Sequence, residues 1–160
     1  MQRHYKTSLP DEAATLALGQ RLAHSLQAGL VIYLHGDLGA GKTALTRAII
    51  QACGHQGKVK SPTYTLAEPY QIQLQGRVIT CMHFDLYRMH NPEELIEAGF
   101  RDDFNANSIC FVEWPEKAGA LLPPADISIH FEILDEGRLI ELCFYTKAGK
   151  ICLDRLELLK

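Results

Sequence analysis

Residues 36 to 43 have the sequence Gly-Asp-Leu-Gly-Ala-Gly-Lys-Thr, and this segment constrains the fold more than any other. It fits the pattern G-x-x-x-x-G-K-[ST] of a phosphate-binding loop (P-loop), in which glycines let backbone N–H groups approach phosphate oxygens closely. An apolar run at 30–34 precedes the loop and predicts a buried strand, while apolar residues at helical spacing follow it over 44–52. This strand–loop–helix context is typical of a functional phosphate site rather than a chance match.

The P-loop predicts a nucleotide and a metal ion with defined roles for individual residues. Lys42 is expected to reach the β- and γ-phosphates, while the Thr43 hydroxyl is expected to hold Mg²⁺. The chain lacks the N-K-x-D motif of guanine-specific proteins, so ATP or ADP is favoured over GTP. The predicted nucleotide-binding residues of the loop are Asp37, Leu38, Gly39, Ala40, Gly41, Lys42, Thr43 and Ala44.

Two further predicted strands end in carboxylates. The apolar run at 78–84 is followed by Asp85, and the run at 108–112 is followed by Glu113. Acids at the ends of buried strands beside a P-loop can bind the metal and orient or activate water, so both are candidate metal ligands and, with the P-loop lysine, candidate catalytic residues. The sequence does not divide these roles, and Asp85 could instead cap a following helical turn. His83 is expected to be structural, because no second ligand has metal-binding spacing.

Three more positions are expected near the nucleotide. Thr63 and Thr65 follow the first helix after the P-loop, where hydrolases of this type often carry a hydroxyl that senses the γ-phosphate and its Mg²⁺. A hydroxyl-rich loop without that role is the alternative. Trp114, the single tryptophan, precedes Pro115 and is expected near the crevice, with an aromatic at the edge of the core as the alternative.

The remaining pattern predicts one domain over residues 1–160, a three-layer α/β P-loop fold with a mainly parallel central sheet. A helix is expected over 8–27 with Ser8 as its cap, and a short helix over 91–99. Hairpins at 66–84 and 127–146 are expected as antiparallel additions to the sheet. The end of the chain, 151–160, is ambiguous between strand and helix.

Composition limits the partners and the setting. The formal net charge is −3, which gives no basic footprint for stable nucleic-acid binding by this chain alone. No apolar run approaches 18 residues, and the N-terminus has no signal-peptide pattern, so no membrane association is expected. Five cysteines without C-x-x-C spacing fit a reducing compartment, and a cytoplasmic protein is expected.

Four segments together resemble one protein family. The P-loop at 36–43, Ser-Pro-Thr-Tyr-Thr-Leu at 61–66, His-Phe-Asp-Leu-Tyr-Arg at 83–88 and Glu-Trp-Pro-Glu at 113–116 are similar to those of TsaE, also called YjeE. This family is the small bacterial ATPase of tRNA threonylcarbamoyladenosine (t6A) synthesis. The resemblance covers almost the whole chain in order, and the combination is more specific than the P-loop alone.

The resemblance implies a function beyond nucleotide binding. TsaE-like proteins work with TsaD and TsaB, which transfer a threonylcarbamoyl group to the adenosine beside the tRNA anticodon. The resemblance implies that the ATPase does not transfer the group, meets tRNA only through the complex, and hydrolyses ATP slowly without its partners. The family pattern implies site roles for Lys42, Thr43, Thr63, Thr65, Asp85, Glu113 and Trp114.

Two other functions use the same loop. A small-molecule kinase needs a second substrate pocket and usually an arginine-rich lid, for which Arg88 and Arg101 are too scattered. A non-catalytic module, in which ATP only sets shape and partner affinity, would bind nucleotide without turnover even with its partners present.

Overall fold

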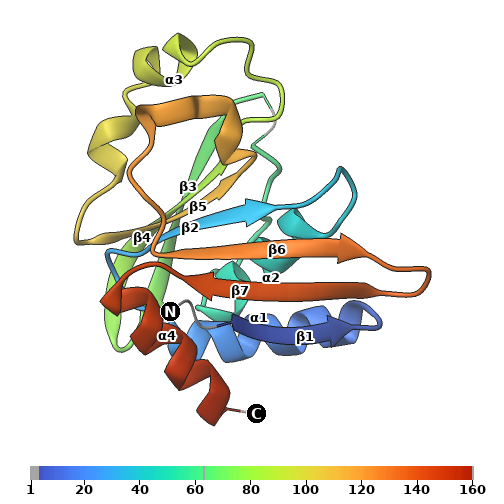
Figure 1. Cartoon of the computed structure of the whole chain (residues 1–160). Coiled ribbons are helices and arrows are strands. Elements are labelled where there is room, and N and C mark those ends of the chain that lie inside the picture. Colours follow the sequence, from blue (N-terminus) through green and yellow to red (C-terminus); the bar gives the residue numbers. More distant parts are fainter. Residues whose placement is uncertain (1–3, 63, 160) are drawn as a thin grey trace.

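A computed structural model describes residues 4–62 and 64–159 (Figure 1). Seven strands form one sheet in the order β1-β7-β6-β2-β5-β4-β3. The strands are β1 (His4–Leu9), β2 (Val31–His35), β3 (Ala67–Leu74), β4 (Arg77–Asp85), β5 (Ser108–Glu113), β6 (Ile127–Ile133) and β7 (Arg138–Phe144). The helices are α1 (Glu12–Ser25), α2 (Lys42–Ala52), α3 (Glu93–Glu97) and α4 (Lys147–Leu158), with 3₁₀ segments η1 (Phe100–Asp103) and η2 (Pro115–Leu121).

The sheet is mixed, with a parallel centre. Strands β6, β2, β5 and β4 pair in parallel, whereas β7, β1 and β3 are antiparallel to their neighbours. The predicted α/β P-loop fold is confirmed, and the mainly parallel description holds for the four central strands. One strand of each expected antiparallel hairpin belongs to that parallel centre. Strand β4 pairs with β3 along one edge and in parallel with β5 along the other, and β6 pairs with β7 and in parallel with β2 in the same way.

Helices cover both faces of the sheet and give it three layers. Buried residues of α1, α2 and α4 share one hydrophobic cluster, and buried residues of α3, η1 and η2 belong to a second. Strand β5 divides between them by alternation, since Phe111 lies in the first cluster and Val112 in the second. In consequence, every second residue of β4 and β5 faces the layer that contains α2.

The N-terminal segment differs from the expected helix over 8–27. Residues 4–9 form β1, which pairs with β7 at the edge of the sheet. Helix α1 is capped by Asp11 instead of Ser8, and the Asp11 carboxylate accepts a hydrogen bond from Ala14 N at 2.9 Å. The alternation of buried Tyr5 and Leu9 marks this strand, but its partner β7 lies more than 120 residues away in the sequence.

The C-terminal ambiguity is resolved in favour of a helix. Helix α4 begins after Thr146, whose hydroxyl accepts a hydrogen bond from Gly149 N at 3.1 Å. It packs in the same cluster as Leu18 and Leu22 of α1 and Leu26 just after that helix, all of which are buried. No helix within residues 4–62 and 64–159 has the length and apolar character required to cross a bilayer.

Helix α1 also fixes the helix that follows the P-loop. A Cβ added at Gly19 of α1 would lie 2.6 Å from the Ala48 side chain of α2, so the two helices pack at a distance that only glycine allows. This contact sets the position of α2 relative to α1, and with it the position of Lys42, the first residue of α2.

Candidate functional site

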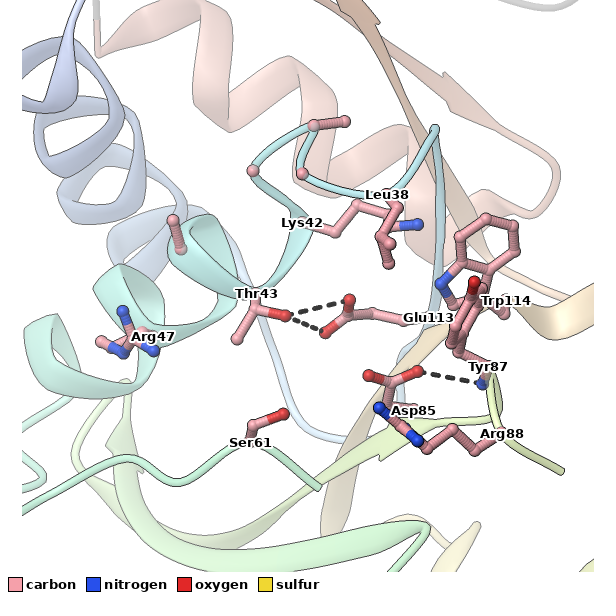
Figure 2. A pocket seen from close by; sticks show the side chains of 14 residues that line it. Leu38, Lys42, Thr43, Arg47, Ser61, Asp85, Tyr87, Arg88, Glu113 and Trp114 are labelled. Atoms are coloured by element: carbon pink, nitrogen blue, oxygen red, sulfur yellow. Dashed lines mark hydrogen bonds between the residues drawn. The ribbon is translucent and has the colours of Figure 1, made fainter. Parts of the chain in front are cut away.

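A cavity of about 450 Å³ lies beside the P-loop, where β4 and β5 end and α2 begins (Figure 2). The C-terminal ends of parallel strands are where α/β folds generally bind ligands. The residues that line it are Leu38, Gly39, Ala40, Gly41, Lys42, Thr43, Ala44, Arg47, Ser61, Asp85, Tyr87, Arg88, Glu113 and Trp114. The structure thus brings together all but one of the predicted P-loop residues, both strand-end acids and the tryptophan; Asp37 is exposed and does not line the cavity.

The P-loop adopts a backbone shape that its glycines permit. Gly39 and Gly41 have φ values of 80° and 104°, a left-handed region that favours glycine. Arg138 of β7 supports the loop from outside, donating to Ala40 O at 3.1 Å and to Gly39 O at 3.2 Å. Sequence reasoning missed Arg138, because nothing local to it indicates that β7 comes near the loop.

Lys42 is almost completely buried at the start of α2. Its ammonium group donates to the carbonyl of Gly36 and lies 3.7 Å from the centre of the Trp114 ring. Burial lowers the pKa of Lys42, while the negative charges of Glu113 and Asp85 act in the opposite direction. A buried ammonium over an aromatic face interacts strongly with a phosphate, because little water competes for it.

The Trp114 indole is held at the cavity by a strained backbone. Trp114 has a φ of 58°, and left-handed backbone is uncommon for a bulky residue. Its ring packs against Tyr87 with a centroid separation of 5.0 Å. The strained turn between β5 and η2 therefore directs the indole over Lys42, while the ring also packs against the edge of the second hydrophobic cluster, as the alternative from the sequence expected.

Glu113 contacts the P-loop directly. Its carboxylate oxygens accept hydrogen bonds from the Thr43 hydroxyl at 2.9 and 3.0 Å (Figure 2). The residue is 2 % exposed, and its Oε2 also lies 2.6 Å from Nε2 of His83. These hydrogen bonds connect Glu113, the last residue of β5, with Thr43, the second residue of α2.

Asp85 lies opposite Glu113 in the register of β4 and β5. Its carboxylate accepts a hydrogen bond from Tyr87 N at 3.0 Å, so the local capping contact foreseen as an alternative is present while the side chain also lines the cavity. Burial raises the pKa of Asp85, with the negative charge of Glu113 adding to the rise and the Tyr87 N–H opposing it.

This raised pKa predicts that Asp85→Asn stabilises the ligand-free protein. The folded state holds the carboxyl proton more tightly than the unfolded state, so the ionised form costs stability once the pH exceeds the ordinary value of about 4. We expect the melting temperature of Asp85→Asn to exceed that of the wild type at pH 7, and the difference to shrink as the pH falls toward 4. The exposed Asp135→Asn is the matched control, and an equal gain there would remove the explanation.

In the segment at 61–66, which carries the two threonines predicted to sense the γ-phosphate, Ser61 lines the cavity beside the P-loop. Thr65 instead lines a neighbouring open hollow of about 800 Å³, and its hydroxyl donates to the Glu68 carboxylate at 3.0 Å. Thr63 lies outside the described residues. The switch role of both threonines stays a prediction.

Several residues at the cavity were missed or weighed differently in the sequence. Arg47 lies one helical turn after Thr43 on α2, a spacing that the sequence could have shown. Arg88 ends the family-like segment at 83–88 and was judged too scattered for a kinase lid, yet it lines the same cavity. Its guanidinium lies 5.2 Å from the Tyr64 ring centre. The lining thus carries three cationic side chains, Lys42, Arg47 and Arg88, against the two carboxylates of Asp85 and Glu113.

A second cavity of about 300 Å³ lies on the other side of the P-loop. It shares Ala40, Gly41 and Ala44 with the first cavity. Its other walls combine apolar groups with polar groups from the start of α1 and from the β6–β7 hairpin, namely Leu9, Pro10, Asp11, Glu12, Thr15, Phe131, Gly137 and Arg138. These elements are not near the loop in the sequence, so only the fold reveals the cavity.

The oxygen atoms at the first cavity fit a magnesium ion. Within the described residues, no group of three or more His, Cys, Asp or Glu side chains is arranged to hold a metal. A Mg²⁺ site does not need such a group, because this ion usually binds one or two carboxylates together with substrate phosphates and water. The Thr43 hydroxyl and the Glu113 and Asp85 carboxylates supply such hard oxygen ligands.

Comparison with known proteins gives consistent results for sequence and fold. Residues 9–140 match the family model "Threonylcarbamoyl adenosine biosynthesis protein TsaE". The chain is 50% identical over 147 residues to the tRNA threonylcarbamoyladenosine biosynthesis protein TsaE of Haemophilus influenzae, covering 89% of this chain and 90% of that protein. It is 40% identical over 131 residues to the TsaE of Rickettsia felis, covering 81% and 74%. The crystal structure of YdiB from Bacillus subtilis superimposes with a TM-score of 0.77 at 25% identity, covering 99% of this chain and 95% of that one.

Proposed function

Because this chain belongs to the TsaE family, whose members take part in tRNA threonylcarbamoyladenosine biosynthesis, we propose that it is a Mg²⁺-dependent ATPase of that pathway. The observation that carries the proposal is the direct contact of the P-loop residue Thr43 with the strand-end acid Glu113, beside the buried ammonium of Lys42. This constellation contains the groups that phosphoryl transfer to water requires.

Each group has a part in the proposed reaction. The amides of the P-loop and the N-terminus of α2 bind the phosphates, and Lys42 stabilises the charge that develops on the γ-phosphate. Bound Mg²⁺ supplies neutralisation of the phosphate charge. We assign Thr43 and Glu113 to the metal, since they contact each other, and Asp85 to the orientation of the attacking water. Trp114 closes one side of the cavity and excludes water from Lys42.

The two cavities together fit a nucleotide. The phosphates occupy the cavity at the start of α2, and the base lies across the P-loop in the second cavity, whose apolar and polar walls suit a flat heteroaromatic ring. Phe131 and Arg138 bring an aromatic ring and a planar guanidinium to this cavity, and Asp11 and Thr15 bring polar side chains. This arrangement supports ATP or ADP as the ligand.

The partners proposed for the chain are TsaB and TsaD, with tRNA reached through their complex. The net charge of −3 supports an indirect role toward tRNA, because stable binding to a polyanion by this chain alone needs a basic surface. A cytoplasmic setting is supported by the five cysteines, which are all buried and form no disulfide in the described part of the chain.

The rate of phosphate release from ATP, measured first alone and then with a TsaB–TsaD complex, tests this function. We expect slow turnover alone, a clear rise with the complex, and loss of both rates when Mg²⁺ is removed by EDTA. Binding of ATP without stimulation would favour a nucleotide-gated binding module, and transfer of the γ-phosphate to a small acceptor would favour a kinase. Either result would overturn the proposal.

A further inference from the structure

His83 is a buried polar side chain at the cavity acids that the proposed reaction leaves without a role. It lies on β4, two residues before Asp85, and is 0 % exposed. Because side chains alternate along a strand, His83 shares a face with Asp85, and this face is the one turned toward α2. Its Nε2 lies 2.6 Å from Oε2 of Glu113 on the neighbouring strand β5. Glu113 comes two residues after Phe111, the residue that pairs with His83 in the register of the two strands.

We propose that His83 is a positioning residue that holds the Glu113 carboxylate toward Thr43. Glu113 has three rotatable side-chain bonds, and its carboxylate contacts two groups from different elements: the Thr43 hydroxyl meets both oxygens, and the His83 ring meets Oε2. The Thr43 hydroxyl is itself assigned to the metal, so its bond to Glu113 competes with that second task. The His83 contact has no such competitor, and it keeps the carboxylate in place.

The chemistry of the contact identifies the donor. An ionised carboxylate only accepts hydrogen bonds, so the proton between the two groups belongs to Nε2 of His83. The other ring nitrogen, Nδ1, is buried and has no hydrogen-bond partner among the described residues. An apolar side chain would fill the same space without an unpaired polar atom, so packing alone does not explain a histidine at this position.

The two acids of the cavity are held independently. Asp85 is fixed by the backbone N–H of Tyr87, while Glu113 depends on His83 and Thr43. Loss of the His83 donor should therefore release Glu113 and leave both Asp85 and the P-loop in place. Residues that orient a metal-binding side chain typically change metal affinity or activity by about 10- to 100-fold.

The test compares His83→Gln with His83→Asn. The glutamine amide nitrogen reaches the position of Nε2 and can donate to Glu113, whereas the asparagine amide nitrogen matches Nδ1 and falls short. Binding of ADP is followed by the fluorescence of Trp114, the single tryptophan, which lines the cavity. We expect ADP affinity without Mg²⁺ to be the same in both variants and the wild type. The apparent Mg²⁺ affinity should fall about 10- to 100-fold in His83→Asn and stay close to wild type in His83→Gln.

The role of His83 rests on the proposed function of Glu113, but this fluorescence measurement does not depend on turnover. If the wild type binds Mg²⁺·ADP yet never hydrolyses ATP, the proposed ATPase fails while the positioning role is still decided. Wild-type Mg²⁺ dependence in His83→Asn would overturn the role, and so would equal losses in both variants. A further check is His83→Asn in a Glu113→Gln background, where we expect no additional loss of Mg²⁺ affinity because the two residues act through one contact.

Discussion

Lys42→Ala is expected to lower the rate of ATP hydrolysis by at least about 100-fold, the usual effect of removing one preorganised donor to a developing charge. The reason is the position of the ammonium group, which is buried, stacked on Trp114 and surrounded by P-loop backbone. No other lysine lines this cavity, and its two other cations, Arg47 and Arg88, lie outside the P-loop. Phosphate release at saturating ATP, with the TsaB–TsaD complex present, measures the change.

The control for this variant is Lys150→Ala, which removes an exposed lysine whose contact is a surface pair with Asp154. Its hydrolysis rate should equal that of the wild type. The melting temperature of ligand-free Lys42→Ala should not fall much, because burial already lowers the pKa of Lys42 and the charged form is costly there. If Lys42→Ala hydrolyses ATP at the wild-type rate, Lys42 has no part in turnover and the proposed mechanism is wrong.

Glu113→Gln is expected to reduce hydrolysis by roughly 100-fold or more, which is within the range for a residue that serves a metal or a proton transfer. Glutamine keeps the length of the side chain and can still accept hydrogen bonds from Thr43 and His83, so the local geometry should survive. What is lost is one negative charge beside the proposed metal. Turnover across a Mg²⁺ titration measures the effect on the metal, and ADP binding without Mg²⁺ measures the effect on the nucleotide site.

In Glu113→Gln we expect the Mg²⁺ concentration for half-maximal turnover to rise, while ADP binding without Mg²⁺ remains near the wild-type level. The matched control is Glu116→Gln, three residues further along, whose side chain is largely exposed and outside the cavity lining. Unchanged Mg²⁺ dependence in Glu113→Gln would contradict the assignment of Glu113 to the metal. Asp85 would then be the acid that binds Mg²⁺, and Glu113 the one that orients the attacking water.

Local sequence signals predicted much of the chain. The P-loop residues 36–43, the strand before them and the helix after them follow from glycine, lysine and hydrophobic spacing within some twenty residues. Hairpin β3–β4 follows from Gln75 and Gly76, both of which have positive φ in the turn between two apolar runs. These features need no information from distant parts of the chain, because turn and helix-start preferences are properties of a few adjacent residues.

Strand β1 and Arg138 show where such signals are insufficient. β1 exists because β7 offers an open edge, and Arg138 supports the P-loop because the β6–β7 hairpin extends alongside it. Both relationships depend on the order of strands in the sheet, which short-range preferences do not determine. The same limit explains why the second cavity beside the P-loop was not foreseen.

The sequence by itself determined the chemistry of the site: a P-loop with Lys42 and Thr43, and acids at the ends of two buried strands. Only the tertiary structure decided how these acids differ. Parallel pairing of β4 and β5 puts Asp85 beside Glu113, but the approach of α2 joins Thr43 to Glu113 alone, and His83 reaches Glu113 from the neighbouring strand. Residue type and spacing fix which groups are present, whereas hydrogen bonds between distant segments depend on distances of a few ångströms that only the packed sheet and helix establish.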